Sequence, residues 1–310
     1  MALVVAGLFI SIVVLGCMAG PVLNTLRWPL EHPGMAAACW LAAVGGTMMG
    51  FAGAVAVVLL RSPAPGHGLL EWLHNCVPGH EHAGVAMAAV TGSVVTIVGA
   101  VRLQRGVPRL WRAIARRRRH RQMLDLIARE DGRHADVLVL DHPVPMAYCL
   151  PSPRRPIVIS TGAQDHLNAE QLRAVLAHER AHLRQRHHIM LLLLDLVHAL
   201  LPWLPTVRRA SASVPLLLEM AADDVAARQC GGPALAGALR KLSITPVSVS
   251  GLAAGAADGR TLMCRLARLD SPMSRGSRGA RLAAWGFFAG AIVAPLAAVA
   301  MAVKELYRPC

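Results

Sequence analysis

Two histidines and a glutamate are spaced for metal chemistry in the segment His-Glu-Arg-Ala-His, which begins at His178. His178 and His182 are four residues apart, so a helix would place their imidazoles one turn apart on the same face. Two ring nitrogens placed in this way can bind one tetrahedral zinc ion. Glu179 lies beside them, where its carboxylate can take a proton from a water that the metal activates. Further along the chain, Glu219 is expected to be the third protein ligand, which leaves one coordination position open.

The residues around this segment independently predict a helix. Asn168 is a good N-cap, and Gln171 follows at the position that closes a capping box. Apolar residues then recur at helical spacing. His187 and His188 follow the metal-binding pair at positions that rotate away from it, so they are expected to be solvated. The simpler alternative for the whole segment is a surface helix with two solvated histidines.

The composition is typical of a membrane protein. The chain of 310 residues is 55% hydrophobic and only 16% charged, which is too apolar for an ordinary soluble domain. Its apolar residues gather in uncharged runs, each long enough to cross a hydrocarbon core of about 30 Å: residues 2–23, 35–60, 84–101 and 282–303. The first run lacks the basic start and the cleavage site of a signal peptide. We therefore expect four transmembrane helices, two of which carry glycines spaced for close helix packing: Gly46 with Gly50, and Gly286 with Gly290.

Arginines predict the orientation of these helices. A dense group lies between residues 102 and 121, after the third apolar run, and a second group precedes the fourth run: Arg265, Arg268, Arg275, Arg278 and Arg281. Because positive charge stays on the cytoplasmic side, both termini are expected outside the cell membrane. The chain then divides into three transmembrane helices in residues 1–101, a cytoplasmic domain in 102–281, and a fourth helix with a short outer tail in 282–310.

The net charge of +14 also bears on partners. The basic run at residues 116–119 adjoins a predicted span, so it is expected to face anionic membrane lipids. Direct nucleic-acid binding is not expected, because no nucleic-acid-binding motif accompanies the charge. Cys76 and Cys310 would both face out in this topology and could form a disulfide.

Residues 189–205 are apolar but short for a span, and they contain Asp195, His198 and two prolines. A single crossing here would place His178 and Glu219 on opposite sides of the membrane, where they could not share a metal. The segment is therefore expected to re-enter the membrane, to lie in its interface, or to fold back over the catalytic domain. Trp203 and the prolines suit an interfacial turn.

Two short apolar runs between the arginines and the metal helix predict strands, at residues 136–140 and 156–160. The arrangement of His178, Glu179, His182 and Glu219 is that of a zinc peptidase. Such enzymes commonly hold their substrate as an added strand on a sheet edge. The second run is hypothesised to be that edge strand, with Ile157 and Ile159 along the substrate, and Pro156 suits an edge position. Tyr148 is a candidate to hydrogen-bond the oxyanion of the reaction.

Four segments together resemble the BlaR/MecR-type membrane metallopeptidases: residues 141–150, 157–162, 172–182 and 219–224. More distantly, they resemble the HtpX-like and CAAX-prenyl-protease-like zinc peptidases. The resemblance implies that His178, His182 and Glu219 bind Zn²⁺ and that Glu179 is the base. The aspartate that these families carry four residues after the third ligand falls on Asp223. It could accept the N–H of a ligating histidine and so orient that ring. The neighbouring residue, Asp224, would point about 100° away around the helix.

The resemblance also implies a biological role. Members of this kind cut a cytoplasmic transcriptional repressor or themselves, and related receptors make a homodimer an expectation. Only residues 304–310 follow the last apolar run, so the extracellular penicillin-binding domain of well-known members is not expected.

We therefore expect a mainly α integral membrane protein with an inserted α/β gluzincin-type zinc peptidase domain, which hydrolyses peptide bonds on the cytoplasmic side. Two alternatives stay open. One is a non-catalytic membrane receptor or scaffold that the metal stabilises, and the other is a basic membrane adaptor without a metal.

Overall fold

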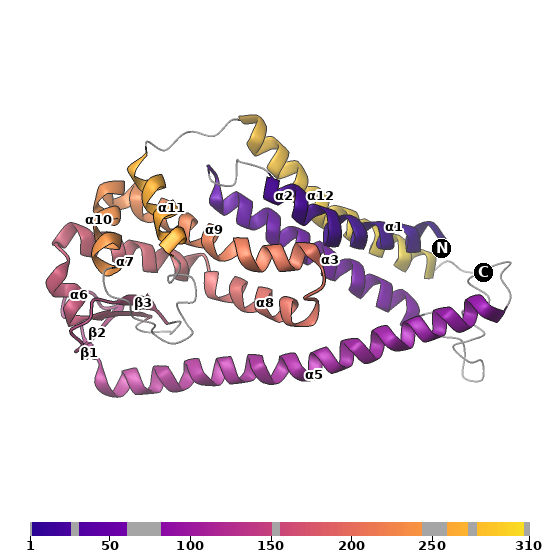
Figure 1. Ribbon diagram of the computed structural model, residues 1–310, viewed down its shortest axis with the longest axis horizontal. Helices are drawn as coiled ribbons and strands as arrows, with labels where there is room; N and C mark the ends of the chain where they lie inside the picture. Colours follow the sequence, from indigo (N-terminus) through magenta and orange to yellow (C-terminus); the bar gives the residue numbers. More distant parts are fainter. Residues whose placement is uncertain are drawn as a thin grey trace.

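The computed structural model describes residues 2–25, 31–60, 82–150, 156–243, 259–271 and 278–306. Within these ranges the chain is mostly helical, with one small sheet. Long apolar helices form a bundle at one end, and the sheet with its covering helices lies at the other end (Figure 1). The prediction of a mainly α chain with a small α/β unit is therefore confirmed. Cys76 and Cys310 lie outside the described residues.

Three apolar runs in the described part are long enough to cross a membrane: Gly7–Thr25, Pro33–Ala54 and Arg278–Met301. The first run is built by α1 (Ala2–Val13), one π-helical turn (Val14–Met18) and α2 (Ala19–Thr25). The other two lie in α3 (Pro33–Leu60) and α12 (Arg278–Leu306). These runs coincide with the first, second and fourth predicted spans. The third predicted span, 84–101, belongs to α5 (His82–Ile127), and its side chains are outside the described part.

Glycines let two of these helix pairs approach closely. A Cβ atom added at Gly46 would lie 2.2 Å from the carbonyl oxygen of Ala291 on α12, and one at Gly50 would lie 2.9 Å from Ile12 on α1. At Gly286 and Gly290, by contrast, an added Cβ would meet nothing within 4 Å. The first glycine pair therefore packs helices as its spacing predicts, whereas the second pair faces open space.

Four strands form the sheet in the order β1-β2-β4-β3: β1 (Arg129–Glu130), β2 (Val137–Leu140), β3 (Ala147–Cys149) and β4 (Ile157–Ser160). β4 pairs in parallel with β2 and antiparallel with β3. The prediction that residues 157–160 form an edge strand is wrong, because this strand has a partner on each side. All four of its residues are buried, which is typical of a central strand. Among the described residues, β3 is the edge strand on this side.

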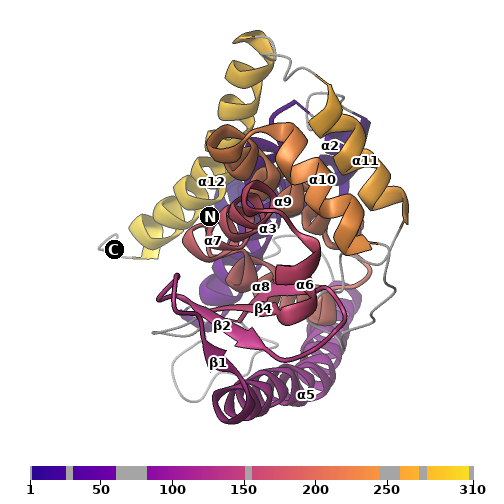
Figure 2. The ribbon, with the colours of Figure 1, turned by 90° about the vertical axis from the view of Figure 1, so that its left-hand side faces the viewer.

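Helices cover both faces of the sheet (Figure 2). On one face lie α6 (Thr161–His166) and α7 (Ala169–Arg184), and the core between sheet and helix includes Ile157, Ile159, Val175 and Leu176. On the other face, the end of α5 contributes Leu124 to a second cluster. The predicted capping box is confirmed, because the side chain of Asn168 accepts from the backbone of Gln171 while the Gln171 side chain accepts from the backbone of Asn168.

The apolar segment after the metal helix is one arm of a helical hairpin. α8 (His187–Leu200) runs away from the sheet, and α9 (Pro205–Cys230) returns beside it and packs against α7 (Figure 1). Trp203 is exposed at the tip, where the guanidinium of Arg102 lies 5.7 Å from its ring centroid. Because α9 returns beside α8, Glu219 lies close to His178. Residues 189–205 therefore do not separate the two residues, and both can bind one metal ion.

The hairpin is also part of the bundle. Leu204, Val214 and Leu217 share one buried cluster with Trp40 of α3 and Leu23 of α2. Two further helices, α10 (Gly232–Ser243) and α11 (Gly259–Asp270), pack against α9 beyond this contact. The helix that carries Glu219 is therefore held at once by the apolar bundle and by the domain around the sheet.

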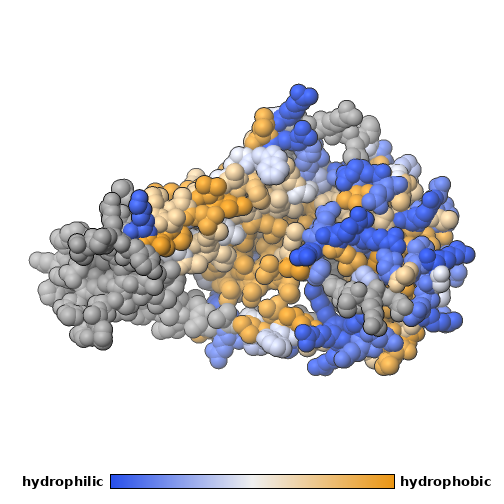
Figure 3. Space-filling view, turned by 180° about the vertical axis from the view of Figure 1, so that it is seen from behind, coloured by the Kyte–Doolittle hydropathy of each residue, from blue (hydrophilic) through white to orange (hydrophobic). Residues whose placement is uncertain are grey.

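The two ends of the molecule differ in polarity. On the face that Figure 3 shows, hydrophobic residues predominate along the coloured part of the bundle, and hydrophilic ones gather on the end that holds the sheet. The first and last described residues lie at the far end of the bundle from the sheet (Figure 1).

Candidate metal centre

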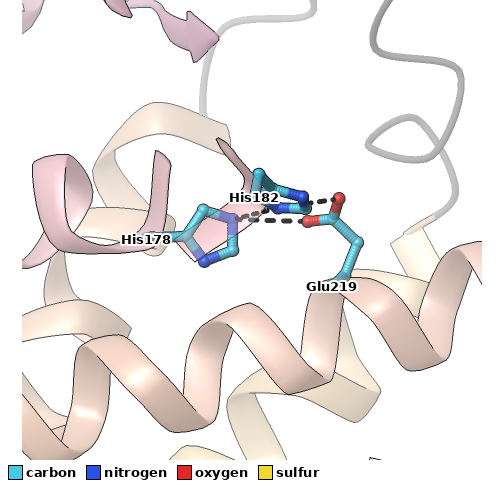
Figure 4. Close-up of side chains that lie close together, drawn as sticks. All are labelled: His178, His182 and Glu219. Atoms are coloured by element: carbon cyan, nitrogen blue, oxygen red, sulfur yellow. Dashed lines mark hydrogen bonds and ion pairs between the residues drawn. The ribbon is translucent and has the colours of Figure 1, made fainter. Parts of the chain in front are cut away.

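The rings of two histidines on α7, His178 and His182, lie side by side (Figure 4). The Nε2 atoms of His178 and His182 are 3.1 Å apart, as their spacing of one helical turn predicts. Both rings are largely shielded, with 9% and 14% of their side-chain surfaces exposed. Burial lowers the pKa of His182 to about 4, so its ring is neutral and has a lone pair to offer.

Glu219 of α9 supplies the third donor (Figure 4). Its Oε2 lies 3.5 Å from Nε2 of His178, and its Oε1 lies 3.4 Å from Nε2 of His182. Ligand atoms bound at about 2.0–2.2 Å to a tetrahedral zinc lie about 3.3–3.6 Å apart. The three side chains therefore have the chemistry that zinc requires, each oxygen of Glu219 lies within this range of one histidine nitrogen, and one ligand atom from each residue lies within 4.8 Å of the others. No other residue in the described ranges joins their cluster.

Two carboxylates of α9 hold the ring of His178. Asp223 is 1% exposed, and its Oδ1 lies 3.0 Å from Nδ1 of that ring, while Glu219 faces Nε2. Burial opposes a positive charge on the ring, but the hydrogen bonds to Asp223 and Glu219 outweigh it and raise the pKa of His178 to about 10. In the same way, burial of Glu219 is outweighed by its hydrogen bond with His178 and by Arg265, which hold its pKa well below the usual range. Because Asp223 faces Nδ1, the ring keeps Nε2 directed at the candidate metal position.

Glu179 lies next to the two histidines and takes no part in the three-donor cluster. Its burial raises the pKa of its carboxyl group. It is hydrogen-bonded to the thiol of Cys149 on β3, and burial together with this carboxylate raises the pKa of that thiol. The S–H group is therefore kept protonated and donates to Glu179, which links β3 to the helix that carries the two histidines.

His187 takes part in the site, so the prediction that it is solvated is wrong. The residue is 2% exposed, and its Nδ1 lies 2.8 Å from Nδ1 of His182. Its Nε2 lies 2.9 Å from Oε1 of Gln185, an atom that can only accept. His187 therefore donates from Nε2 and accepts at Nδ1, which places a proton on Nδ1 of His182 and leaves Nε2 of His182 free for the metal.

A break in the helix explains the error. In one straight helix, His187 would point away from His182. Instead, α7 ends at its C-cap Gln185, and Arg186 adopts a left-handed conformation with φ 54°. The chain then starts α8 with His187 turned back toward the site. Residues 183–187 contain no glycine or other typical turn residue, so the sequence did not predict this break. The next residue, His188, is half-buried and lies near the charge of Arg117, whereas His187 contacts His182.

Arg265 of α11 also belongs to the site, although the sequence places it in the basic group before the fourth apolar run. It was expected to set the membrane orientation, but it is 6% exposed and bound to Asp223 and Glu219. Its neighbour Arg268 is bound to Asp224, which confirms that Asp224 points away from the histidines. Nothing in the spacing of these arginines shows which acid each one meets, because the contact joins separate helices.

Three residues proposed for substrate or oxyanion contacts do not reach the site. Ile157 and Ile159 are 0% and 1% exposed, in the core between the sheet and α7. Tyr148 packs on the opposite face of the sheet, with Leu124, and its hydroxyl lies 3.1 Å from Nε2 of His120 on α5. The alternation of a strand explains the placement, because Cys149 and not Tyr148 points toward Glu179.

The comparison with known proteins agrees with this geometry. No curated protein and no solved structure matches the chain. Residues 113–229, from the last part of α5 to the end of α9, match Peptidase family M48. The matched range includes both histidines, Glu179, Glu219 and Asp223. Arg265 lies beyond it. The M48 domain and the His-His-Glu cluster together support a metallopeptidase, a hydrolase of a family whose members typically depend on zinc.

Proposed function

We propose that this protein is a membrane-bound zinc metalloendopeptidase that hydrolyses peptide bonds on the cytoplasmic side. One observation carries the proposal: His178, His182 and Glu219 converge on one point, and Glu179 lies beside them with no part in the cluster. Three protein ligands among the described residues leave a coordination position open, which is the arrangement of catalytic zinc sites, whereas structural sites have four. This favours an enzyme over a scaffold that the metal merely stabilises.

The residues divide the chemistry between them. His178, His182 and Glu219 would hold the zinc ion, which would supply a Lewis acid for the scissile carbonyl and the attacking water. Glu179 takes the proton of that water and passes it to the leaving amine, and the raised pKa of its buried carboxyl group suits a group that holds a proton between the two steps. Asp223 and His187 keep the rings of His178 and His182 in the required tautomers.

The substrate position follows from the sheet. β3 has a partner strand on one side only in the described part of the chain, and Cys149 links it to Glu179. An extended peptide that pairs with β3 would lie over the general base and the metal position. β3 therefore replaces residues 157–160 as the strand that we propose to hold substrate.

The membrane location has independent support. Three candidate spans occur in the described part, and the first and last described residues lie at the far end from the metal centre. With the arginines of residues 102–121 on the inner side, this arrangement agrees with both termini outside and the peptidase domain in the cytoplasm. A cytoplasmic repressor, the chain itself or both are the proposed substrates, on the resemblance described above.

The test compares detergent-purified wild type with Glu179→Gln. Glu170→Gln is the matched control, because it is an exposed acid on the same helix. We expect one zinc per chain in all three proteins by elemental analysis. Cleavage of a mixed peptide library, and of the chain itself, should be detected by mass spectrometry in wild type and Glu170→Gln only. His178→Ala should lose the metal.

Each contrary result has a distinct meaning. Cleavage by Glu179→Gln at the wild-type rate would remove the general-base assignment. Bound zinc without cleavage in wild type would favour the non-catalytic receptor, and absence of zinc from wild type would overturn the metal site.

A further inference from the structure

We infer that Arg265 of α11 is a positioning residue of the metal centre, which holds Glu219 and Asp223 in the geometry that metal binding needs. The inference rests on the metal site proposed above and goes beyond it, because it brings in an element outside the matched peptidase range. Along the chain, α10 and residues 244–258 separate α11 from the helix that carries Glu219. Arg265 therefore reaches Glu219 only because α11 packs against α9.

The guanidinium uses each of its three nitrogens. Nε lies 2.8 Å from Oδ2 of Asp223 and Nη2 lies 2.7 Å from Oδ1 of the same carboxylate. Nη1 lies 2.9 Å from Oε2 of Glu219. Arg265 and Asp223 are 6% and 1% exposed, so water cannot easily replace these contacts. A fork of this kind fixes the plane of a carboxylate, which a lysine ammonium cannot do.

The first consequence concerns His178. The Oδ1 atom of Asp223 that receives Nη2 of Arg265 also lies 3.0 Å from Nδ1 of His178. A carboxylate held in two places by the guanidinium presents this oxygen to the ring in one orientation. Arg265 therefore orients His178 indirectly, through its contacts with Asp223.

The second consequence concerns Glu219. Nη1 of Arg265 engages its Oε2 atom, which also lies 3.5 Å from Nε2 of His178, while Oε1 lies 3.4 Å from Nε2 of His182. This division favours a glutamate that binds metal through one oxygen. A second bound oxygen would occupy the position that hydrolysis requires for water or substrate.

The third consequence concerns charge. Three carboxylates, those of Glu179, Glu219 and Asp223, meet in a largely shielded space, and Arg265 is the permanent cation that the structure describes among them. Its guanidinium lies within 2.9 Å of two of these carboxylates, those of Asp223 and Glu219, and so offsets the repulsion between them.

The neighbouring arginine offers a matched control. Arg268 lies one turn further along α11 and binds Asp224 of α9 through both guanidinium ends. Arg240 of α10 also binds Asp270 of α11. These bridges dock the same helix without touching a residue of the metal cluster. Replacement of Arg268 therefore measures how far weaker packing of α11 affects zinc binding. Replacement of Arg265 adds to this the loss of the contacts that position Glu219 and Asp223.

The experiment measures zinc dissociation constants by competition with a chromogenic chelator, on the full-length protein in detergent. The proteins are wild type, Arg265→Gln, Arg265→Lys and Arg268→Gln. We expect Arg265→Gln to bind zinc about 10–100-fold more weakly, the range found when the partners of metal ligands are removed. Arg265→Lys keeps the charge but not the fork and should also be weakened about tenfold or more. Arg268→Gln should stay within about twofold of wild type.

Two results would overturn the inference. Equal losses in Arg265→Gln and Arg268→Gln would mean that both act only by docking α11. Wild-type zinc affinity in Arg265→Lys would mean that the fork has no positioning role, and this variant decides the matter even if Arg265→Gln does not fold.

A second measurement tests the route through Asp223. In the Asp223→Asn background, replacement of Arg265 by Gln should weaken zinc binding less than it does in wild type, because residues that act as a unit are not additive. Full additivity would contradict that route. A wild type that binds no zinc would instead overturn the metal site, and bound zinc without cleavage would bear only on the proposed peptidase activity.

Discussion

Nδ1 of His178 lies 3.0 Å from Oδ1 of Asp223, a buried carboxylate one helical turn after the proposed ligand Glu219. One helix therefore supplies a proposed metal ligand and also the carboxylate that faces a proposed ligand of another helix. This depends on α9 packing antiparallel to α8 and across α7, since only then do residues 219 and 223 face the ring of His178.

Replacement of Asp223 tests this relationship. Asp223→Ala should weaken zinc binding about 10–100-fold, because His178 would lose the acceptor that fixes its tautomer. Asp224→Ala is the control, since Asp224 is bound to Arg268 and not to a histidine. Zinc affinities from chelator competition should separate the two variants, and equal affinities would contradict the orienting role of Asp223.

The second prediction concerns His187. His187→Ala removes the group that faces Nδ1 of His182, so zinc affinity should fall about tenfold. His188→Ala changes the adjacent residue, which lies near Arg117, and should bind zinc as wild type does. Elemental analysis after dialysis against a weak chelator gives the comparison. A wild-type zinc content in both variants would mean that the contact between His187 and His182 does not strengthen zinc binding.

The third prediction concerns pH and the bridge between Asp136, just before β2, and Arg180 of α7. Two hydrogen bonds of 2.7 and 2.8 Å from the guanidinium hold the pKa of Asp136 below its ordinary value. Its contribution to stability is therefore present above the ordinary carboxyl pKa and lost as the pH falls through the lowered value. Both side chains are about one-third exposed, so solvent screening limits it to about 1 kcal/mol or less.

Thermal unfolding of wild type and Asp136→Asn at several pH values tests this bridge. The variant should unfold at a lower temperature near neutral pH, and the difference should shrink below about pH 4. Asp165→Asn, at an exposed carboxylate of α6, serves as the control and should follow wild type throughout. A difference that grows as the pH falls would contradict the assigned direction of the pKa shift.

The fourth prediction concerns helix packing in the bundle. Gly46→Ala should destabilise the protein by about 1–3 kcal/mol, because its Cβ would lie 2.2 Å from the backbone of Ala291. Gly45→Ala places the same methyl group in open space and should be neutral or stabilising by up to about 1 kcal/mol. Unfolding temperatures in one detergent should order the proteins as Gly45→Ala, wild type, Gly46→Ala. The opposite order would contradict the close contact of α3 with α12.

Local patterns in the sequence predicted the elements well where a few neighbouring residues decide them. Asn168 and Gln171 close a capping box because both lie in the first turn of the same helix. His178 and His182 face each other because one turn separates them. The uncharged runs became helices long enough to cross a membrane in the three cases for which the structure describes the side chains.

Predictions that depended on distant neighbours failed or could not be made. Pro156 suggested an edge strand, but the position of β4 depends on β2 and β3, which pair with it from both sides. Tyr148 and Cys149 are adjacent, and only the orientation of β3 decides which of them meets Glu179.

By itself, the sequence determined the residue types of the proposed metal site, the helix that carries its histidines, and the apolar helices beside it. These depend on residue type and on spacing within one or two turns. Only the tertiary structure decided that α9 returns to bring Glu219 to the histidines, that His187 turns back toward His182, and that Arg265 enters the site from α11. Those contacts arise from helix ends and interhelical packing, for which the spacing of residues along one chain carries no signal.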